Sequence, residues 1–76
     1  MLRRPVNSSV IASIGYSPAD ERLEVEFHNG RVYEYRGVPA AAYYALMSAN
    51  SIGACFNKTI RDRYRSRQVP VSGRAT

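Results

Sequence analysis

The sequence predicts an α+β domain, in which a three-stranded antiparallel β-meander is followed by one or two helices. Two patterns indicate this class. Residues 8–36 alternate between apolar and polar side chains, which is the period of a β-strand, whereas residues 40–64 carry apolar side chains at about every fourth position, which is typical of a helix. With 76 residues, the chain is long enough for one small domain. We therefore expect a single core between the sheet and the helices.

Three strands are predicted from the alternation. Alternate positions of residues 8–16, beginning with Val10, are apolar, and Ile11 is the one exception. Residues 23–28 alternate without exception, which predicts a strand with one buried face and one solvated face. A third strand is expected over residues 31–36, because the glycine that follows them ends the pattern.

The loop between the second and third strands decides where two tyrosines point. A two-residue loop of Asn29-Gly30 would turn Tyr33 and Tyr35 away from the apolar side of the second strand. A three-residue loop over residues 28–30, with glycine in the left-handed bulge position, would instead pair Val25 with Tyr33. Only the three-residue loop separates apolar from charged side chains, so we predict it. The tyrosines are then expected on the core side, with a stacking platform for nucleotide bases as the alternative.

Two helices are predicted after the meander. The first covers residues 40–49 and follows Pro39, which suits a first helical turn. The second begins at the N-cap Ser51 and extends through residues 51–67, because apolar residues recur there at every fourth position. A strand in part of this region is an alternative. A second architecture is a small, strongly bent Sm-like or SH3-like β-barrel, in which residues 68–71 add a closing strand.

The remaining features define the expected boundaries and setting of the domain. We expect residues 1–7 to form a loose basic arm, residues 8–67 to form the domain, and residues 68–76 to form a flexible tail or a short edge strand. One cysteine cannot form an internal disulfide, and neither a leader pattern nor a membrane-spanning apolar run is present. We therefore expect a cytoplasmic protein without a membrane partner. Its small core favours a homo-oligomer.

The basic residues are concentrated near the end of the predicted second helix. The chain carries a net charge of +5, and residues 57–67 hold five basic side chains and one acidic one. Arginine predominates over lysine, and its planar guanidinium group binds phosphate oxygens in bidentate fashion. We therefore predict a surface that binds RNA or another polyanion. Its expected residues are Asn57, Lys58, Arg61, Arg63, Tyr64, Arg65 and Arg67.

The sequence offers little for catalysis or metal binding. His28 and Cys55 are two soft ligands, fewer than the three or four of a usual zinc site. A thiol-dependent site would combine Cys55 with His28 as the base and Asn57 as the orienting group, but no local pattern supports it. No glycine-rich phosphate loop is present. We therefore expect neither an enzyme, nor a cofactor, nor a metal site.

Residues 8–64 also resemble a known family, the KTSC domain. The resemblance lies in the order and spacing of short motifs: Ser9, Ile14-Gly15-Tyr16, Leu23-x-Val25-x-Phe27-x-x-Gly30, Tyr33-x-Tyr35, Val38-Pro39, Tyr43, Leu46, Ala49-x-Ser51-x-Gly53, Phe56-Asn57, Ile60-Arg61 and Tyr64. That domain occurs alone in small bacterial proteins and at the C-terminus of some lysyl-tRNA synthetases, so the resemblance implies RNA binding. It also implies a shared polar site at Ser51, Gly53, Asn57 and Arg61. The expected function is a non-catalytic RNA-binding module, and the alternative is a protein-interaction or self-assembly module.

Overall fold

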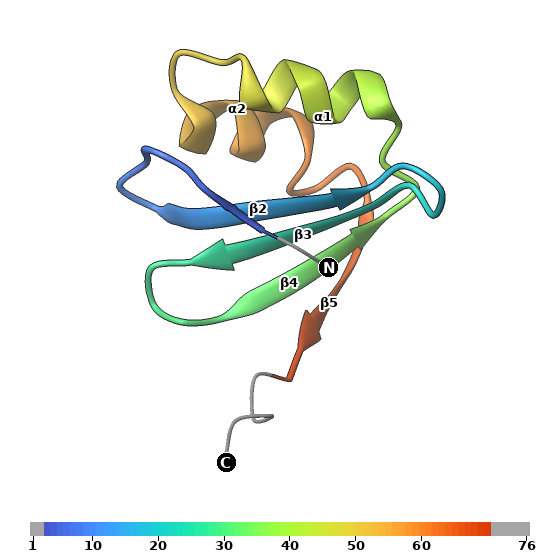
Figure 1. Ribbon diagram of the computed structural model, residues 1–76, viewed down its shortest axis with the longest axis horizontal. Helices are drawn as coiled ribbons and strands as arrows, with labels where there is room; N and C mark the ends of the chain where they lie inside the picture. The colour runs from blue at the N-terminus through green and yellow to red at the C-terminus, as the bar shows by residue number, and fades with distance from the viewer. Residues whose placement is uncertain (1–2, 71–76) are drawn as a thin grey trace.

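The computed structural model describes residues 3–70 and shows two helices on one face of a five-stranded antiparallel sheet (Figure 1). The strands lie side by side in chain order: β1 (Arg4–Pro5), β2 (Ile11–Ser17), β3 (Arg22–Phe27), β4 (Val32–Arg36) and β5 (Arg65–Val69). The helices α1 (Ala40–Met47) and α2 (Ile52–Thr59) separate β4 from β5 in the chain. The α+β class is therefore confirmed. The predicted meander corresponds to β2–β4, and it undercounts the sheet by the two edge strands.

The helix predicted over residues 51–67 is wrong in its second half. Its start is as predicted, because the Ser51 hydroxyl accepts a hydrogen bond of 3.3 Å from the Ala54 N–H. The helix ends at Thr59, and the chain then turns and returns along β4, with Arg65 opposite Arg36. Pairing with a strand distant in the sequence decides the conformation of β5, and a local pattern does not report such pairing.

Both edges of the sheet differ from expectation. Residues 4–5, which we placed in a loose arm, pair with β2, so that Arg4 lies opposite Ile14. The C-terminal strand begins at Arg65 rather than within residues 68–71. Within residues 3–70, β1 and β5 do not pair with each other, so the sheet is open and not a closed barrel. Residues 71–76 of the predicted tail lie outside the described residues.

The β3–β4 hairpin has the predicted three-residue register. Val25 lies opposite Tyr33, and the N–H of Phe27 donates to the carbonyl oxygen of Arg31 at 2.9 Å. Gly30 has a φ of 89°, a left-handed conformation that suits glycine at the bulge position. Tyr33 and Tyr35 therefore point to the helix-covered side of the sheet. This confirms the prediction, which placed apolar and charged side chains on opposite faces.

A β-bulge explains the one exception in the first strand. Ile11 lies opposite Phe27 and Ser13 opposite Glu26, so the register shifts by one residue between them. The extra residue brings Ile11 and Ile14 to the same face, although three positions separate them. Val10, which the plain alternation assigned to the core, is instead 49% exposed.

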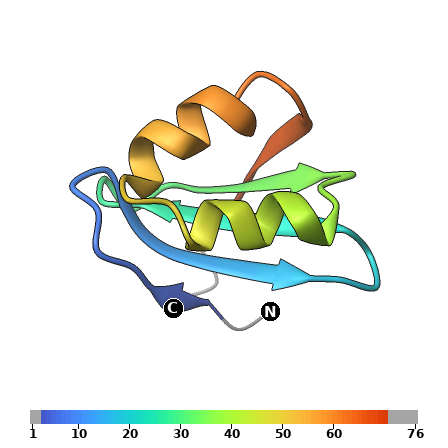
Figure 2. The ribbon, with the colours of Figure 1, turned by 90° about the horizontal axis from the view of Figure 1, so that it is seen from above.

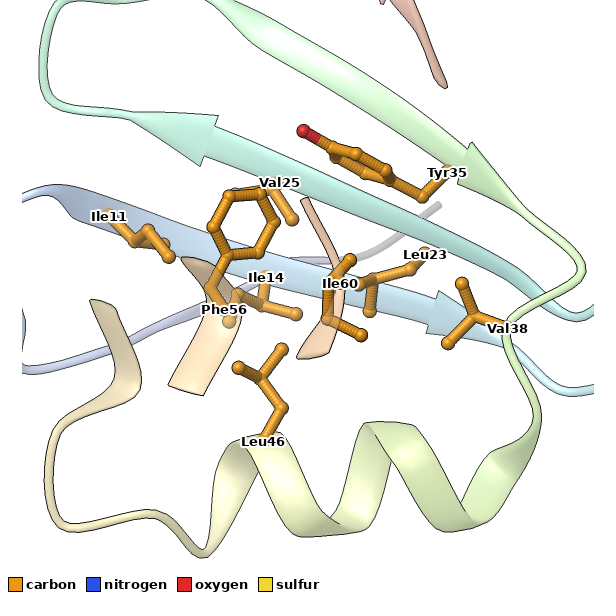
Figure 3. Close-up of a cluster of buried hydrophobic side chains, with 9 residues drawn as sticks. All are labelled: Ile11, Ile14, Leu23, Val25, Tyr35, Val38, Leu46, Phe56 and Ile60. Atoms are coloured by element: carbon orange, nitrogen blue, oxygen red, sulfur yellow. The ribbon is translucent and has the colours of Figure 1, made fainter. Parts of the chain in front are cut away.

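The core lies between the sheet and the two helices (Figures 2 and 3). Its buried residues are Ile11, Ile14, Leu23, Val25, Tyr35, Val38, Leu46, Phe56 and Ile60. Each helix contributes one of them, Leu46 from α1 and Phe56 from α2. Neither helix in residues 3–70 has the length and apolar character that a membrane crossing requires.

Candidate nucleic-acid interface

A pocket of about 530 Å³ lies between α2, the β3–β4 hairpin and β5. We call it the aromatic pocket, because four of its lining residues are aromatic: Phe27, Tyr33, Tyr35 and Phe56. The other lining residues are Val10, Asn29, Arg31, Asn57, Arg61, Asp62 and Ser66. The lining thus combines aromatic rings with polar and charged groups, and both kinds of side chain occur in ligand sites.

The aromatic rings of the pocket pack against one another edge to face. Phe56 has ring-centroid distances of 5.6 Å to Phe27 and 5.4 Å to Tyr35, with interplanar angles of 70° and 83°. Tyr33 meets Phe27 in the same manner, at 5.8 Å and 77°. Such pairs hold the rings in fixed orientations. Tyr35 is only 5% exposed and belongs to the core, whereas Tyr33 is half-buried and has surface left for a ligand.

The predicted basic residues do not share one helix face, because the helix ends before most of them. Lys58 lies in the last turn of α2, Arg61 and Arg63 lie in the turn that follows, and Arg65 and Arg67 lie on β5. Among the predicted residues, Asn57 and Arg61 reach the aromatic pocket. They are adjacent, since Nη1 of Arg61 donates to Oδ1 of Asn57 at 3.5 Å. The half-buried Tyr64 packs against the core.

The opposite face of the sheet carries a second cluster of arginines around one buried carboxylate. Glu34 is 5% exposed and forms ion pairs with Arg22, Arg36 and Arg67 at 3.2, 3.3 and 3.4 Å. A pocket of about 690 Å³, which we call the outer pocket, is lined by Glu34, Arg36, Arg65, Ser66 and Arg67. Three cations around one carboxylate leave this region net positive.

Strand β5 separates the two pockets. Ser66 lines both of them, and it lies opposite Tyr35 on β4. The neighbouring residues Arg65 and Arg67 point to the opposite face from Ser66, because side chains alternate along a strand. The edge of the sheet at β5 is therefore a narrow ridge with a hollow on each side.

Most of the predicted basic side chains carry no ion pair within the part of the chain that the structure describes. In residues 3–70, no carboxylate oxygen lies within 4.0 Å of Lys58, Arg61, Arg63 or Arg65. The same holds for Arg31 at the hairpin loop. Their positive charge is thus available to an anionic ligand.

Sequence reasoning missed several residues of the aromatic pocket. Arg31 was not among the predicted site residues, although residues 31, 33 and 35 share one side of a strand by their period of two. That period was the available signal. Phe27 and Phe56 were not among the predicted site residues either, and no sequence signal identified Asp62 or Ser66.

The polar site implied by the family resemblance is divided in the structure. Asn57 and Arg61 line the aromatic pocket. Ser51 and Gly53 lie at the start of α2 and line another hollow of about 440 Å³ beside Ser8. The two hollows share Asn57 and Val10 among their lining residues.

His28 and Cys55, two of the three residues considered for thiol chemistry, have other partners. Nε2 of His28 is hydrogen-bonded to the carbonyl oxygen of Ser8 at 2.8 Å, and the Cys55 thiol lies 3.7 Å from the Thr59 hydroxyl. Among residues 3–70, no group of three or more His, Cys, Asp or Glu side chains is arranged to hold a metal ion.

Burial raises the pKa of Tyr35, and this makes the free energy of unfolding depend on pH in the alkaline range. Burial raises the pKa of its phenol above the ordinary value of 10.0, and the neighbouring Tyr33 and Asp62 add to the increase, while Arg61 opposes it. The folded protein therefore holds this proton more tightly than the unfolded chain. The resulting stability is fully present below pH 10.0 and is lost as the pH rises through the folded-state pKa.

We therefore expect the urea midpoint of unfolding to fall as the pH is raised above 10.0, and to fall less steeply in Tyr35→Phe. Part of the dependence should remain in the variant, because the pKa of Tyr16 is raised as well, chiefly by burial. Tyr44→Phe is the matched control, since Tyr44 is 66% exposed. Equal alkaline slopes in the Tyr35 and Tyr44 variants would contradict the assignment.

Comparison with known proteins gives one consistent family. The model of the KTSC domain matches residues 7–64. An uncharacterized protein from Stutzerimonas stutzeri is 39% identical over 64 residues, which cover 84% of this chain and 90% of the relative. A lysine–tRNA ligase from Nostoc punctiforme is 38% identical over 61 residues, which cover 80% of this chain but only 11% of the ligase.

A solved structure has the same fold. The crystal structure of a KTSC domain protein from Yersinia pestis matches with a TM-score of 0.86 and 41% sequence identity. The match covers 91% of this chain and 97% of the other. Since the family model covers most of the described sheet and both helices, the chain belongs to the KTSC domain family.

Proposed function

We propose that the chain is a non-catalytic module that binds single-stranded RNA in the cytoplasm, through the aromatic pocket and the basic residues around it. The pocket is the observation that carries this proposal. It combines a wall of aromatic rings with Arg31 and Arg61 at the rim, both without a carboxylate within 4.0 Å in residues 3–70. Aromatic rings stack on bases, and guanidinium groups bind phosphates. Single strands are favoured, because a duplex hides the faces of its bases.

The occurrence of the domain in larger proteins supports an RNA ligand. Two relatives are named lysine–tRNA ligases, one from Nostoc punctiforme and one from another Nostoc species. The matched segment is a small part of each, 11% of its length. A domain joined to an enzyme that acts on tRNA lies close to RNA, and the surface of this chain has the charge to bind it.

The two pockets suggest how a strand would run across the molecule. A base would enter the aromatic pocket and stack on Tyr33, whose ring is half-buried. The backbone would then cross the ridge of β5, where Arg65 and Arg67 lie on the far side from the aromatic rings. Phosphates on both sides of the ridge would thus contact arginine.

The test is binding of a labelled single-stranded RNA of about 12 nucleotides at about 50 and 200 mM salt. Arg61→Gln should weaken binding about tenfold, which corresponds to the loss of about 1.5 kcal/mol from one charged hydrogen-bonded contact. Arg4→Gln is the matched control, because it removes the same charge from β1 at the other edge of the sheet.

A variant of the pocket wall separates the pocket from charge alone. Tyr33→Leu keeps an apolar side chain and the net charge but removes the stacking surface, so it should weaken binding about tenfold. Undetectable binding at low salt would contradict the proposal. So would equal losses in Arg61→Gln and Arg4→Gln, because the charge would then act without a site.

The outer edge of β5 favours a second candidate, self-assembly through strand addition. Within residues 3–70 this edge has no partner strand. Arg65, Arg67 and Pro70 oppose such pairing, because charges and proline are the features that protect edge strands from one another. Light scattering of the same samples distinguishes the candidates, since an oligomer joined through β5 would cover the ridge that RNA is expected to cross.

A further inference from the structure

One side chain of the aromatic pocket has the wrong charge for a phosphate. Asp62 lines the pocket beside Arg61 and is exposed. In residues 3–70, no lysine, arginine or histidine nitrogen lies within 4.0 Å of its carboxylate. An ionised carboxylate only accepts hydrogen bonds. Asp62 therefore favours a part of the ligand that donates hydrogen bonds, and this part cannot be the phosphate.

The RNA bases differ in the donors that they present to a carboxylate. Guanine carries two adjacent donors on its Watson–Crick edge, N1–H and the N2 amino group, which match the two oxygens of one carboxylate. Adenine and cytosine each present one amino group beside an acceptor, and uracil presents one N–H between two carbonyl oxygens. Those acceptors would face the negative charge of Asp62. Guanine is the base that avoids this repulsion.

The neighbours of Asp62 complement the rest of the same base. Arg61 and Asn57 line the same pocket as Asp62, and Nη1 of Arg61 lies 3.5 Å from Oδ1 of Asn57. Guanine also carries the acceptors O6 and N7, and arginine is their commonest protein partner. One carboxylate with adjacent guanidinium and amide donors thus matches the donors and acceptors of guanine.

We propose that the aromatic pocket selects guanine, with Asp62 accepting from N1–H and N2–H and Arg61 and Asn57 donating to its acceptors. This inference rests on the proposed function, because it names the base that the RNA-binding site prefers. Asp62 is a specificity-determining residue here, and its removal should change the ratio of affinities between bases more than the affinity for RNA as such.

The experiment compares oligouridine strands of about six nucleotides that carry one central guanosine, inosine, adenosine or cytidine. The guanosine strand should bind about tenfold more tightly than the adenosine or cytidine strand. Inosine lacks the N2 amino group and should lose most of this preference. In Asp62→Asn the ratio of guanosine to adenosine affinity should approach one. Asp20→Asn, the same change at the exposed β2–β3 turn, should leave the ratio as in the unmodified protein.

The outcomes separate this inference from the proposed function. Equal affinities for all the strands would overturn guanine selection and leave RNA binding intact. A guanine preference that persists in Asp62→Asn would also overturn it, because another group would then read the base. Absence of binding to every strand at low salt would overturn both.

Discussion

Replacing Phe56 with alanine is expected to remove most of the free energy of unfolding. The Phe56 ring is 3% exposed and contacts Phe27 and Tyr35, so it joins α2 to two strands. Truncation of such a buried aromatic residue costs about 3–5 kcal/mol, of which a large part comes from the cavity that remains. A domain of this size has a total stability near the lower end of about 5–15 kcal/mol. Urea denaturation followed by circular dichroism measures the loss.

Two variants control this result. Phe56→Leu keeps most of the apolar volume and should cost about 1.5 kcal/mol or less. Tyr44→Ala removes an aromatic ring from α1 that is 66% exposed, and it should change the stability by about 0.5 kcal/mol or less. If Phe56→Ala were no more harmful than Tyr44→Ala, the packing of α2 on the sheet described above would be wrong.

Replacing Glu34 with glutamine is expected to destabilise the protein by about 2 kcal/mol. Its carboxylate is buried and is the shared partner of three arginines on the open face of the sheet. Nε of Arg22 is already buried without a hydrogen-bond partner in residues 3–70, and its guanidinium group has Glu34 at 3.2 Å as its nearer carboxylate and the exposed Asp20 at 3.7 Å. The side chains of Arg36 and Arg67 are 62% and 66% exposed, so water can solvate their guanidinium groups once the carboxylate is gone. The cost is therefore lower than for a fully buried ion pair.

The measurement is the urea midpoint of unfolding for Glu34→Gln at low and high salt. Glu21→Gln is the matched control, because Glu21 is an exposed carboxylate without an ion pair in the described residues. The difference between the two variants should shrink as salt rises, since screening weakens the exposed part of the cluster. A loss in Glu34→Gln that matches the control would show that the cluster contributes little stability.

Strand pairing within the meander was predictable because the residues concerned are close in the sequence and strongly patterned. The register that opposes Val25 to Tyr33 follows from the separation of apolar and charged residues across a short loop. The bulge that buries Ile11 was visible only as an exception to the alternation. A bulge adds one residue to a strand, so the apolar positions before and after it no longer fit one alternating pattern.

The end of α2 was not predictable from the pattern that was followed. An apolar residue at every fourth position continues from Ile60 to Tyr64, and both residues do pack inward. The basic residues of the same segment, however, alternate from position 61 to position 67, which is the period of the strand that forms there. Both periods were present in the sequence. Non-local pairing of β5 with β4 decides between them.

The candidate site was only partly predictable, because it is assembled from segments that are distant in the chain. The hairpin, the end of α2, the turn after it and β5 each supply some of its residues. Composition identified the basic segment, and two of its members, Asn57 and Arg61, do border the aromatic pocket. The contributions of Asp62 and Ser66 depend on the tertiary fold.

If the proposed ligand binds across β5, the position of this strand couples binding to the pairing of β5 with β4. This strand has a single neighbour in the described sheet, and its residue Ser66 belongs to the wall of both hollows. A ligand that touches both sides holds β5 against β4 and is released when that strand detaches. By mass action, a higher occupancy of the ligand site must then increase the fraction of molecules in which β5 is paired with β4, and the reverse must also hold. Saturation with ligand would protect the backbone of β5 from fraying. Conversely, a change that weakens the pairing of β5 with β4 would lower the affinity, even if every residue that contacts the ligand were unchanged.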